Sequence, residues 1–438
     1  MQEQKAIIWF RNNLRVLDNK SLHQASISHK KIIAYYNFDT NYYKKDKWGF
    51  KKTEKFRAKF LIETIEDLKN SLAELNISLI IDNSPSISGL IDVIKKHGIN
   101  DIYCQKEWTV EEEKIEKDLI EKSPKGFNLN SEYDQFLFHP DDIMIESINI
   151  PEVFSSFRKK IEKRITVREC CPVPIKLDKS NLLEETFPIP KLEDLNLDPF
   201  KVDINSAFPF QGGTKSGLDR INFYFWKSKK LGFYKKTRNG LLKTDYSSKL
   251  SSWLANGSIS ARQIYWEVKK FEDEILKNQS TYWLIFELIW RDYFKYISIK
   301  HGNKIFRLGG IYSKSKVWKI DLDTINSWIN GTTKESFINA NMIELKKTGW
   351  MSNRGRQNVA SYLTKDLLID WRVGASYFES MLIDYDVHSN YGNWIYNSGI
   401  GNDPMPDRKF NPKFQADRYD PNNTFQKLWL NKQYEIDL

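Results

Sequence analysis

The sequence predicts an α/β domain with a parallel sheet, followed by an all-α domain. In the first third of the 438 residues, short apolar runs alternate with amphipathic segments, as they do in β-α-β units. Beyond Ser216, helical patterns dominate and strand patterns almost vanish. Hydrophobic residues make up 40% of the chain and aromatic residues 14%, which excludes a disordered protein. A chain of this length can form two or three domains and still enclose a large planar ligand.

Apolar runs and the amphipathic segments between them define the first domain, which we place at residues 1–130. The runs predict strands at 6–10, 32–36, 77–82 and 101–105, and the amphipathic segments predict helices at 56–75 and 87–97. Because helices separate the strands, the strands are expected to pair in parallel.

A connector at residues 131–213 follows, since proline and charged residues replace the periodic pattern there. The glycine-rich segment 212–217 does not have phosphate-loop spacing and is interpreted as a linker turn. The helical domain is placed at 214–438. Ser260 and Gln263 form a capping box that opens a helix towards Leu276. The apolar stripe of Val359, Leu363 and Leu367 predicts a helix over 356–369.

Composition limits the classes of function. With 67 Lys and Arg against 57 Asp and Glu, the formal charge is +10, which either attracts a polyanion or simply keeps the protein in solution. The three cysteines fit a reducing compartment and are too few for an iron–sulfur cluster. The six histidines have no metal-site spacing, so no metal is expected. Without a leader or a membrane-spanning run, a cytoplasmic protein with no membrane contact is expected.

Three segments carry residues that suit ligand chemistry. Residues 348–404 are dense in Trp, Arg, Asp and Asn, and are typical of a ligand site or of a solvated polar loop. Residues 247–251 place serine hydroxyls before a short helix around Trp253, which suits a diphosphate or a plain helix cap. Glu287, Trp290 and Arg291 fall on one helix face, as either a core Trp beside an ion pair or a base-stacking site.

The order of residues in 348–404 and in the opening segment 7–25 resembles the photolyase and cryptochrome family of light-driven flavoproteins, and is most similar to its cryptochrome DASH branch. Asn13 stands where relatives commonly have Asp. The resemblance implies a Rossmann-like antenna domain and a helical FAD-binding domain.

It also implies roles for individual residues. FAD would be held by Tyr234, Ser247, Ser248, Lys249, Leu250, Ser251, Glu287, Arg291, Asn353, Arg356, Asp384, Asp386 and Asn390. Arg356 would pair with Asp384, Asp386 would accept a hydrogen bond from the flavin ring and Asn390 would lie near N5. Damaged DNA would be contacted by Arg238, Glu287, Trp290, Asn353, Arg354, Gln357 and Tyr396. The residues assigned to catalysis are Trp394, Trp371, Trp318, Glu287 and Asn390, the tryptophans as an electron-transfer chain from the surface to the flavin.

Glu107 matches the acidic residue that holds a folate antenna, 5,10-methenyltetrahydrofolate, in relatives. Photolyases that act on duplex DNA carry Met and Trp where this chain has Gln357 and Tyr396. The more polar pocket should repay less of the cost of extruding a pyrimidine dimer from a duplex.

The expected function is therefore that of a deoxyribodipyrimidine photolyase-type lyase: a blue-light FAD enzyme that repairs cyclobutane pyrimidine dimers, mainly in single-stranded DNA, as a monomer. The alternatives are a cryptochrome-type photoreceptor or a regulator that binds DNA or RNA with little repair, and a flavin-binding protein without a light function.

Overall fold

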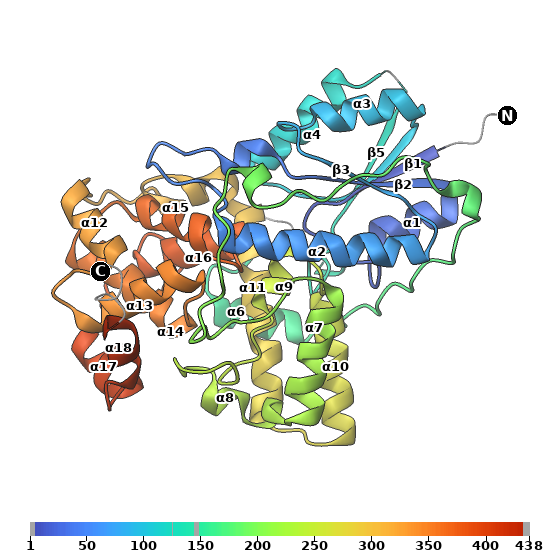
Figure 1. The fold of residues 1–438 in the computed structure, drawn as a ribbon. Helices are drawn as coiled ribbons and strands as arrows, with labels where there is room; N and C mark the ends of the chain where they lie inside the picture. The colour runs from blue at the N-terminus through green and yellow to red at the C-terminus, as the bar shows by residue number, and fades with distance from the viewer. Residues whose placement is uncertain (1–4, 125, 144–148, 432–438) are drawn as a thin grey trace.

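The N-terminal part of the protein is a parallel sheet. The computed structural model describes residues 5–124, 126–143 and 149–431. The sheet has five parallel strands in the order β3-β2-β1-β4-β5 (Figure 1). The strands are β1 (Lys5–Trp9), β2 (Lys31–Asn37), β3 (Leu79–Asp82), β4 (Asp101–Gln105) and β5 (Asn128–Glu132). The four predicted strands and their parallel pairing are confirmed.

Strand β5 was not predicted from the sequence. Its residues, Asn-Leu-Asn-Ser-Glu, form no apolar run, and none of them is buried. It lies at the edge of the sheet beside β4, where one side has no partner strand. The boundary proposed at residue 130 falls inside this strand.

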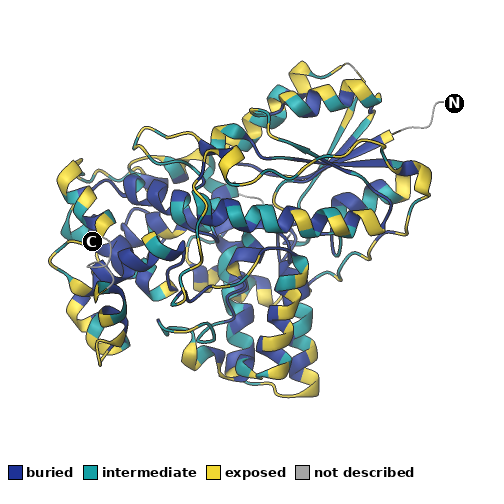
Figure 2. Ribbon diagram, in the orientation of Figure 1, coloured by how far each residue is buried: buried dark blue, intermediate teal, exposed yellow. Residues whose placement is uncertain are grey.

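Two helical layers cover the sheet. One face packs on α1 (Lys20–Ser28) and α2 (Lys55–Glu74), through residues such as Leu22 and Leu68. The other face packs on α3 (Ser88–His97) and α4 (Val110–Lys122), through residues such as Leu90 and Leu119. Figure 2 shows the central strands buried and the outer faces of α3 and α4 exposed. The predicted helices 56–75 and 87–97 are confirmed as α2 and α3.

The remainder is helical and forms a separate, larger core (Figure 1). Its helices are α5 (Pro140–Ile143), α6 (Phe154–Glu162), α7 (Thr214–Ile221), α8 (Tyr234–Thr237), α9 (Ser251–Asn256), α10 (Ala261–Glu274), α11 (Gln279–His301), α12 (Leu322–Asn330), α13 (Ser336–Thr348), α14 (Asn353–Ser361), α15 (Trp371–Met381), α16 (Val387–Asn397), α17 (Pro412–Tyr419) and α18 (Thr424–Leu430). The capping box of Ser260 and Gln263 at the start of α10 is confirmed.

The interpretation of residues 212–217 as a linker turn was wrong, because α7 already begins at Thr214. The side chains that fix the start of this helix belong to α2. Asp67 accepts the backbone N–H of Thr214 at 2.7 Å, and Thr64 accepts that of Gly213 at 3.0 Å. A Cβ atom at Gly212 would lie 2.1 Å from the Phe60 carbonyl oxygen, so the glycine permits this close approach.

The helix predicted over 356–369 starts earlier and ends earlier. Its α-helical part is α14, and a wider π-helical turn over Tyr362–Asp366 follows. Leu363 is buried as predicted, whereas Leu367 is only half-buried because the chain leaves the helix there.

A buried network of charges joins the two parts of the protein. The Arg262 guanidinium on α10 pairs with Asp18 at 2.8 Å and with Asp134 at 2.6 Å. Arg15 pairs with the second oxygen of Asp134 at 2.8 Å, and Ser260 donates a hydrogen bond to Asp18. Burial opposes the charge of Asp18, but Arg262 and Arg15 outweigh that effect, so the pKa of Asp18 lies below its usual value.

We expect Arg262→Met to destabilise the protein by about 3–5 kcal/mol, because two buried carboxylates lose their partner. Urea unfolding followed by circular dichroism measures the change.

In the wild type, the contribution of Asp18 to the free energy of unfolding is present at neutral pH and is lost as the pH falls below about 4, since its folded pKa is lowered. The control Lys96→Met removes an exposed ion pair with Glu185 and should change little. Equal effects of the two substitutions would contradict the assignment.

Candidate functional site

One cavity of about 260 Å³ lies among the loop before α9 and the helices α8, α9, α11 and α14. Its lining contains nearly every residue that the sequence assigned to the flavin: Tyr234, Ser247, Ser248, Lys249, Leu250, Ser251, Glu287, Arg291, Asn353, Arg356, Asp384 and Asp386. Asn390 lines an adjoining space of about 100 Å³, together with Gln357 and Trp394. The fold thus brings together residues separated by more than 150 positions in the chain.

The serine loop is fixed from behind by a residue that the sequence analysis missed. Arg220 on α7 is buried and donates to the carbonyl oxygens of Ser247 and Ser248, both at 3.0 Å, and of Thr244 at 3.2 Å. Asp245 balances its charge at 2.8 Å. Since the carbonyl oxygens are engaged by Arg220, they are held away from an anion in the cavity. No local pattern marks Arg220, because it lies more than twenty residues before the loop.

Lys249 supplies a buried cation in the lining of the same cavity. Its Nζ has no hydrogen-bond partner in the described part of the chain and lies 3.3 Å from the centre of the Tyr246 ring. Burial lowers the pKa of Lys249 well below its usual value. A bound diphosphate would satisfy this group and favour its charged form, so the residues present fit the phosphates of FAD.

Arg356 and Asp384 form the ion pair that was expected, with Nη2 at 2.9 and 3.0 Å from the two carboxylate oxygens. The Arg356 Nε donates to the Met351 carbonyl at 2.9 Å, which fixes the side chain along α14. Arg291 is held in a similar way by the carbonyl oxygens of Gln135 and Leu254. Both guanidinium groups are therefore held in place by protein atoms.

Asp386 caps the start of α16 and is ionised. Its Oδ1 accepts the Ser389 N–H at 2.8 Å, and its Oδ2 pairs with Lys295 at 3.0 Å. Burial would favour the neutral acid, but Lys295 prevails and the pKa of Asp386 is strongly lowered. A buried carboxylate of this kind is a strong hydrogen-bond acceptor for a ring N–H. The sequence analysis missed Lys295, whose partner is 91 residues away.

The residues assigned to DNA do not all line the same cavity. Glu287 and Asn353 line the 260 Å³ cavity, and Glu287 pairs with Arg238 at 2.7 Å. Burial raises the pKa of Glu287, although Arg238 opposes the shift. Arg354 donates to Gln357 at 2.8 Å.

Trp290 is not among the residues that line that cavity. One face of its indole is stacked on Phe154, with the ring centres 3.6 Å apart, and Tyr396 meets it edge-on at 5.9 Å. Tyr293 and Phe294 also contact this indole, with ring centres 5.4 and 5.6 Å away, so four aromatic rings contact the Trp290 side chain in the described structure.

Of the three assigned tryptophans, two are buried and one is partly exposed. Trp394 and Trp371 are 2% and 0% exposed, and Trp318 is half-buried. Trp394 rests against α15 at Gly374, where a Cβ atom would lie 2.2 Å from the indole. Gly374 is three residues after Trp371 and therefore lies on the same face of α15. The Trp394 indole, which packs on Gly374, thus lies on the side of α15 that carries Trp371. The segment of Trp318 pairs with this region through Lys319 and Asp370, whose backbone bond is 3.0 Å.

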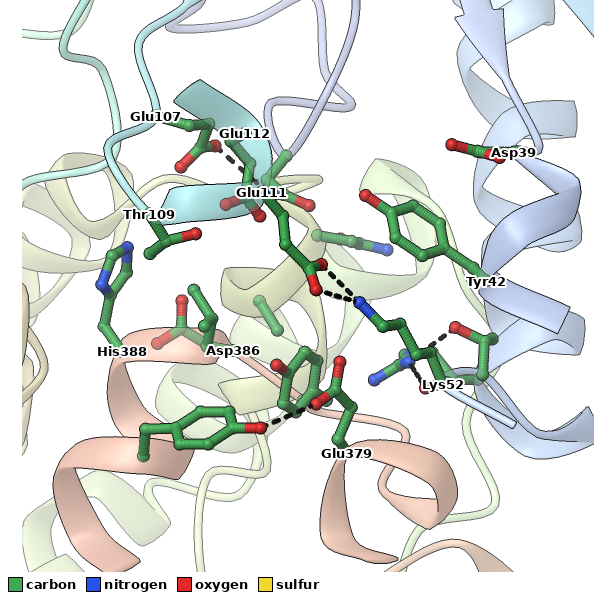
Figure 3. Close-up of a pocket in the computed structure, with 18 of the residues that line it drawn as sticks. Asp39, Tyr42, Lys52, Glu107, Thr109, Glu111, Glu112, Glu379, Asp386 and His388 are labelled. Atoms are coloured by element: carbon green, nitrogen blue, oxygen red, sulfur yellow. Dashed lines mark hydrogen bonds and ion pairs between the residues drawn. The ribbon is translucent and has the colours of Figure 1, made fainter. Parts of the chain in front are cut away.

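A second cavity, of about 680 Å³, lies between the α/β domain and the helical domain (Figure 3). Glu107 lines it and accepts hydrogen bonds from Gln105 at 2.8 Å and Asn12 at 3.3 Å. Burial, with the nearby charge of Glu107, raises the pKa of Glu112 to about 7. Polar atoms without a hydrogen-bond partner belong to Asn37, Arg57, Gln105, Glu112 and His388, all in the described lining. Such a set suits a polar ligand or ordered water. Of these residues the sequence analysis singled out only Glu107.

Within the described ranges, no three His, Cys, Asp or Glu side chains are grouped to hold a metal ion. In the same part of the chain, no helix is both long and apolar enough to span a membrane.

Comparisons with known proteins agree with this geometry. The family model described as DNA photolyase matches residues 6–176, and the one described as the FAD binding domain of DNA photolyase matches residues 283–437. The chain is 42% identical to the cryptochrome DASH of Gloeobacter violaceus over 431 residues, covering 98% of this chain and 86% of that protein. It is 40% identical to the chloroplastic/mitochondrial cryptochrome DASH of Arabidopsis thaliana, covering 97% and 75%.

Solved structures show the same similarity. The crystal structure of the Synechocystis sp. PCC6803 cryptochrome superposes with a TM-score of 0.92 at 41% identity, covering 98% of this chain and 90% of that one. A bacterial class III photolyase from Agrobacterium tumefaciens shares the fold with a TM-score of 0.82 at 24% identity, covering 98% and 87%. The chain therefore belongs to the photolyase and cryptochrome family of FAD flavoproteins, and its strongest similarity is to cryptochrome DASH.

Proposed function

We propose that this protein uses blue light to repair cyclobutane pyrimidine dimers, with a preference for single-stranded DNA. The carrying observation is that the residues assigned to FAD, except Asn390, line one cavity together with Glu287 and Asn353. When bound, fully reduced FAD supplies, on absorbing light, the electron that opens the dimer ring. The protein binds the cofactor, positions the lesion and excludes water.

The cavity residues have different roles, which follow from their charge and polarity. The serine loop and Lys249 hold the diphosphate, because they offer hydroxyl groups and a buried cation. Asp386 accepts a hydrogen bond from the flavin ring, and Arg356 lies along it with its charge balanced by Asp384. Asn390, in the adjoining space, lies near the reactive edge of the ring.

The preference for single strands follows from the side chains at the lesion site. Gln357 accepts a hydrogen bond from Arg354, and Tyr396 lies edge-on to Trp290, so the site offers polar groups beside a partly buried indole. Stacking of a base on an aromatic side chain repays about 1–3 kcal/mol. Extruding a dimer from a duplex costs roughly a few kcal/mol, and a single strand avoids most of that cost.

The tryptophans Trp394, Trp371 and Trp318 form the proposed path for reducing the flavin. The exposure of Trp318 supports this, since it alone of the three is partly exposed to solvent.

The interdomain cavity is the proposed site of a folate antenna, 5,10-methenyltetrahydrofolate. Glu107 offers a carboxylate to the N–H groups of a pterin, and the neighbouring unpaired polar atoms can bind its other edge. Glu107 and Asp386 line the same cavity, which supports an antenna site beside the flavin site.

A second candidate is a blue-light receptor or a regulator that binds DNA or RNA, because the relatives are named cryptochromes. A repair assay separates the two functions. A monomer in the cytoplasm stays our expectation, although the Arabidopsis relative is named chloroplastic/mitochondrial.

We expect Asp386→Ala to weaken FAD binding about 10- to 100-fold, since a hydrogen bond to a charged group contributes about 1.5–3 kcal/mol. The Kd is measured by flavin fluorescence on reconstitution of the apoprotein. Asp321→Ala is the matched control, because Asp321 also caps a helix but lies outside the cavity. Wild-type protein that neither contains nor takes up FAD would refute the proposed function.

We expect Trp394→Phe to abolish rapid photoreduction of the oxidised flavin, because phenylalanine keeps most of the volume but is far harder to oxidise. Absorbance at the flavin bands during blue illumination measures the rate. Trp429→Phe is the control: this indole is as buried as that of Trp394 but belongs to a different core cluster. Unchanged rates in Trp394→Phe would remove this residue from the path.

We expect Trp290→Ala to lower affinity for a dimer-bearing single strand by about 1–3 kcal/mol, with a smaller effect on an undamaged strand. Binding should also weaken as salt rises, because phosphate contacts release counterions. Titrations on matched oligonucleotides, followed by timed illumination, test both claims. Equal repair of intact duplex and single strand would contradict the substrate preference.

A further inference from the structure

The indole of Trp371 contacts one aromatic ring in the described part of the chain, and that ring belongs to Tyr391. Their centres are 6.1 Å apart and the planes are nearly perpendicular, at 83°, which is an edge-to-face contact. Trp318, the expected next member of the path, has no ring contact with Trp371. Because electron tunnelling slows steeply with distance, a ring in direct contact with Trp371 is well placed to donate to it once Trp371 is oxidised, and Tyr391 is such a ring.

Tyr391 also has a proton acceptor. Its hydroxyl donates a hydrogen bond to the Oε2 of Glu379 at 3.2 Å. Both residues line the interdomain cavity, and Glu379 is labelled in Figure 3. Phe306 packs on the Tyr391 ring with the centres 4.7 Å apart. The phenol is thus enclosed by Trp371, Phe306 and a carboxylate.

The electrostatics of this pair favour a coupled loss of electron and proton. Burial and the charge of Glu379 raise the pKa of Tyr391 well above its usual value, so the phenol is neutral before oxidation. Burial also raises the pKa of Glu379, against the opposing charges of Lys52 and Arg57. A carboxylate with a raised pKa is a stronger base for the phenol proton.

We propose that Tyr391 is an electron donor to Trp371 and that Glu379 takes its proton, which forms a second branch of the photoreduction path. This inference rests on the proposed tryptophan path. When bound, oxidised FAD would supply the oxidant on absorbing light: Trp394 would give up one electron and regain one from Trp371, and Trp371 would regain one from Tyr391. Tyr391 loses one electron and its hydroxyl proton, and Glu379 gains that proton.

The branch has a functional consequence. Once the proton rests on Glu379, Tyr391 is a neutral radical, and it cannot take an electron back without recovering the proton. The separated charge is therefore longer-lived than one that ends on a tryptophan. It also rests at the wall of the interdomain cavity.

The test uses full-length protein loaded with oxidised FAD, after a laser flash, with time-resolved absorption and electron paramagnetic resonance. Growth on ring-deuterated tyrosine identifies a tyrosyl signal in the wild type without any substitution. We expect a tyrosyl radical in the wild type, its loss in Tyr391→Phe with a shorter lifetime of the separated charge, and slower formation in Glu379→Gln. Formation should also slow in deuterated water.

Tyr385→Phe is the matched control, because Tyr385 lines the same cavity and has no ring contact with Trp371; its signal should match the wild type. Flavin content and circular dichroism show that each variant is folded. A tryptophan radical without a tyrosyl radical in the wild type, or a tyrosyl signal that persists in Tyr391→Phe, would overturn the branch alone. Absence of both radicals in flavin-loaded protein would instead reject the tryptophan path itself.

Discussion

The buried ion network of Arg15, Asp18, Asp134 and Arg262 is the constraint on which both cavities depend. It connects the first loop of the sheet domain, the segment after β5 and the start of α10. Each carboxylate is fully buried, so any shift between the two domains would leave a charge unpaired at a cost of several kcal/mol. This fixes the width of the interdomain cavity and the position of the helices that enclose the flavin site.

Ion pairs also organise the flavin site, because several of its charged groups have partners of opposite charge before a ligand binds. Arg356 is paired with Asp384, and Asp386 with Lys295. Lys249 is the exception in the described lining, since its Nζ has no hydrogen-bond partner. Preorganised polar groups need little rearrangement on binding, which favours affinity and keeps the electronic environment of the ring constant.

The two cavities share a wall formed by α11 and α16. Asp386 and Arg291 line both, and Lys295 lines the larger one while it pairs with Asp386. Charges buried this close together are weakly screened, so a charge placed in one cavity is felt in the other. Tyr391 of α16 and Glu379 of α15 also line the larger cavity. An antenna, a flavin and a path for electrons can therefore be arranged around one helix pair.

The sequence by itself determined four of the five strands, the helices α2 and α3 and the α10 cap, because buried runs, helical periodicity and i,i+3 hydrogen bonds are local. Through family resemblance it also assigned most of the flavin cavity, including the pair of Arg356 and Asp384. Edge strand β5 and the start of α7 were missed, since one has a polar sequence and the other is capped by Asp67 of α2. Only the tertiary structure placed Arg220 behind the serine loop and Tyr391 against Trp371. These contacts depend on how whole helices pack, and no short-range sequence pattern encodes them.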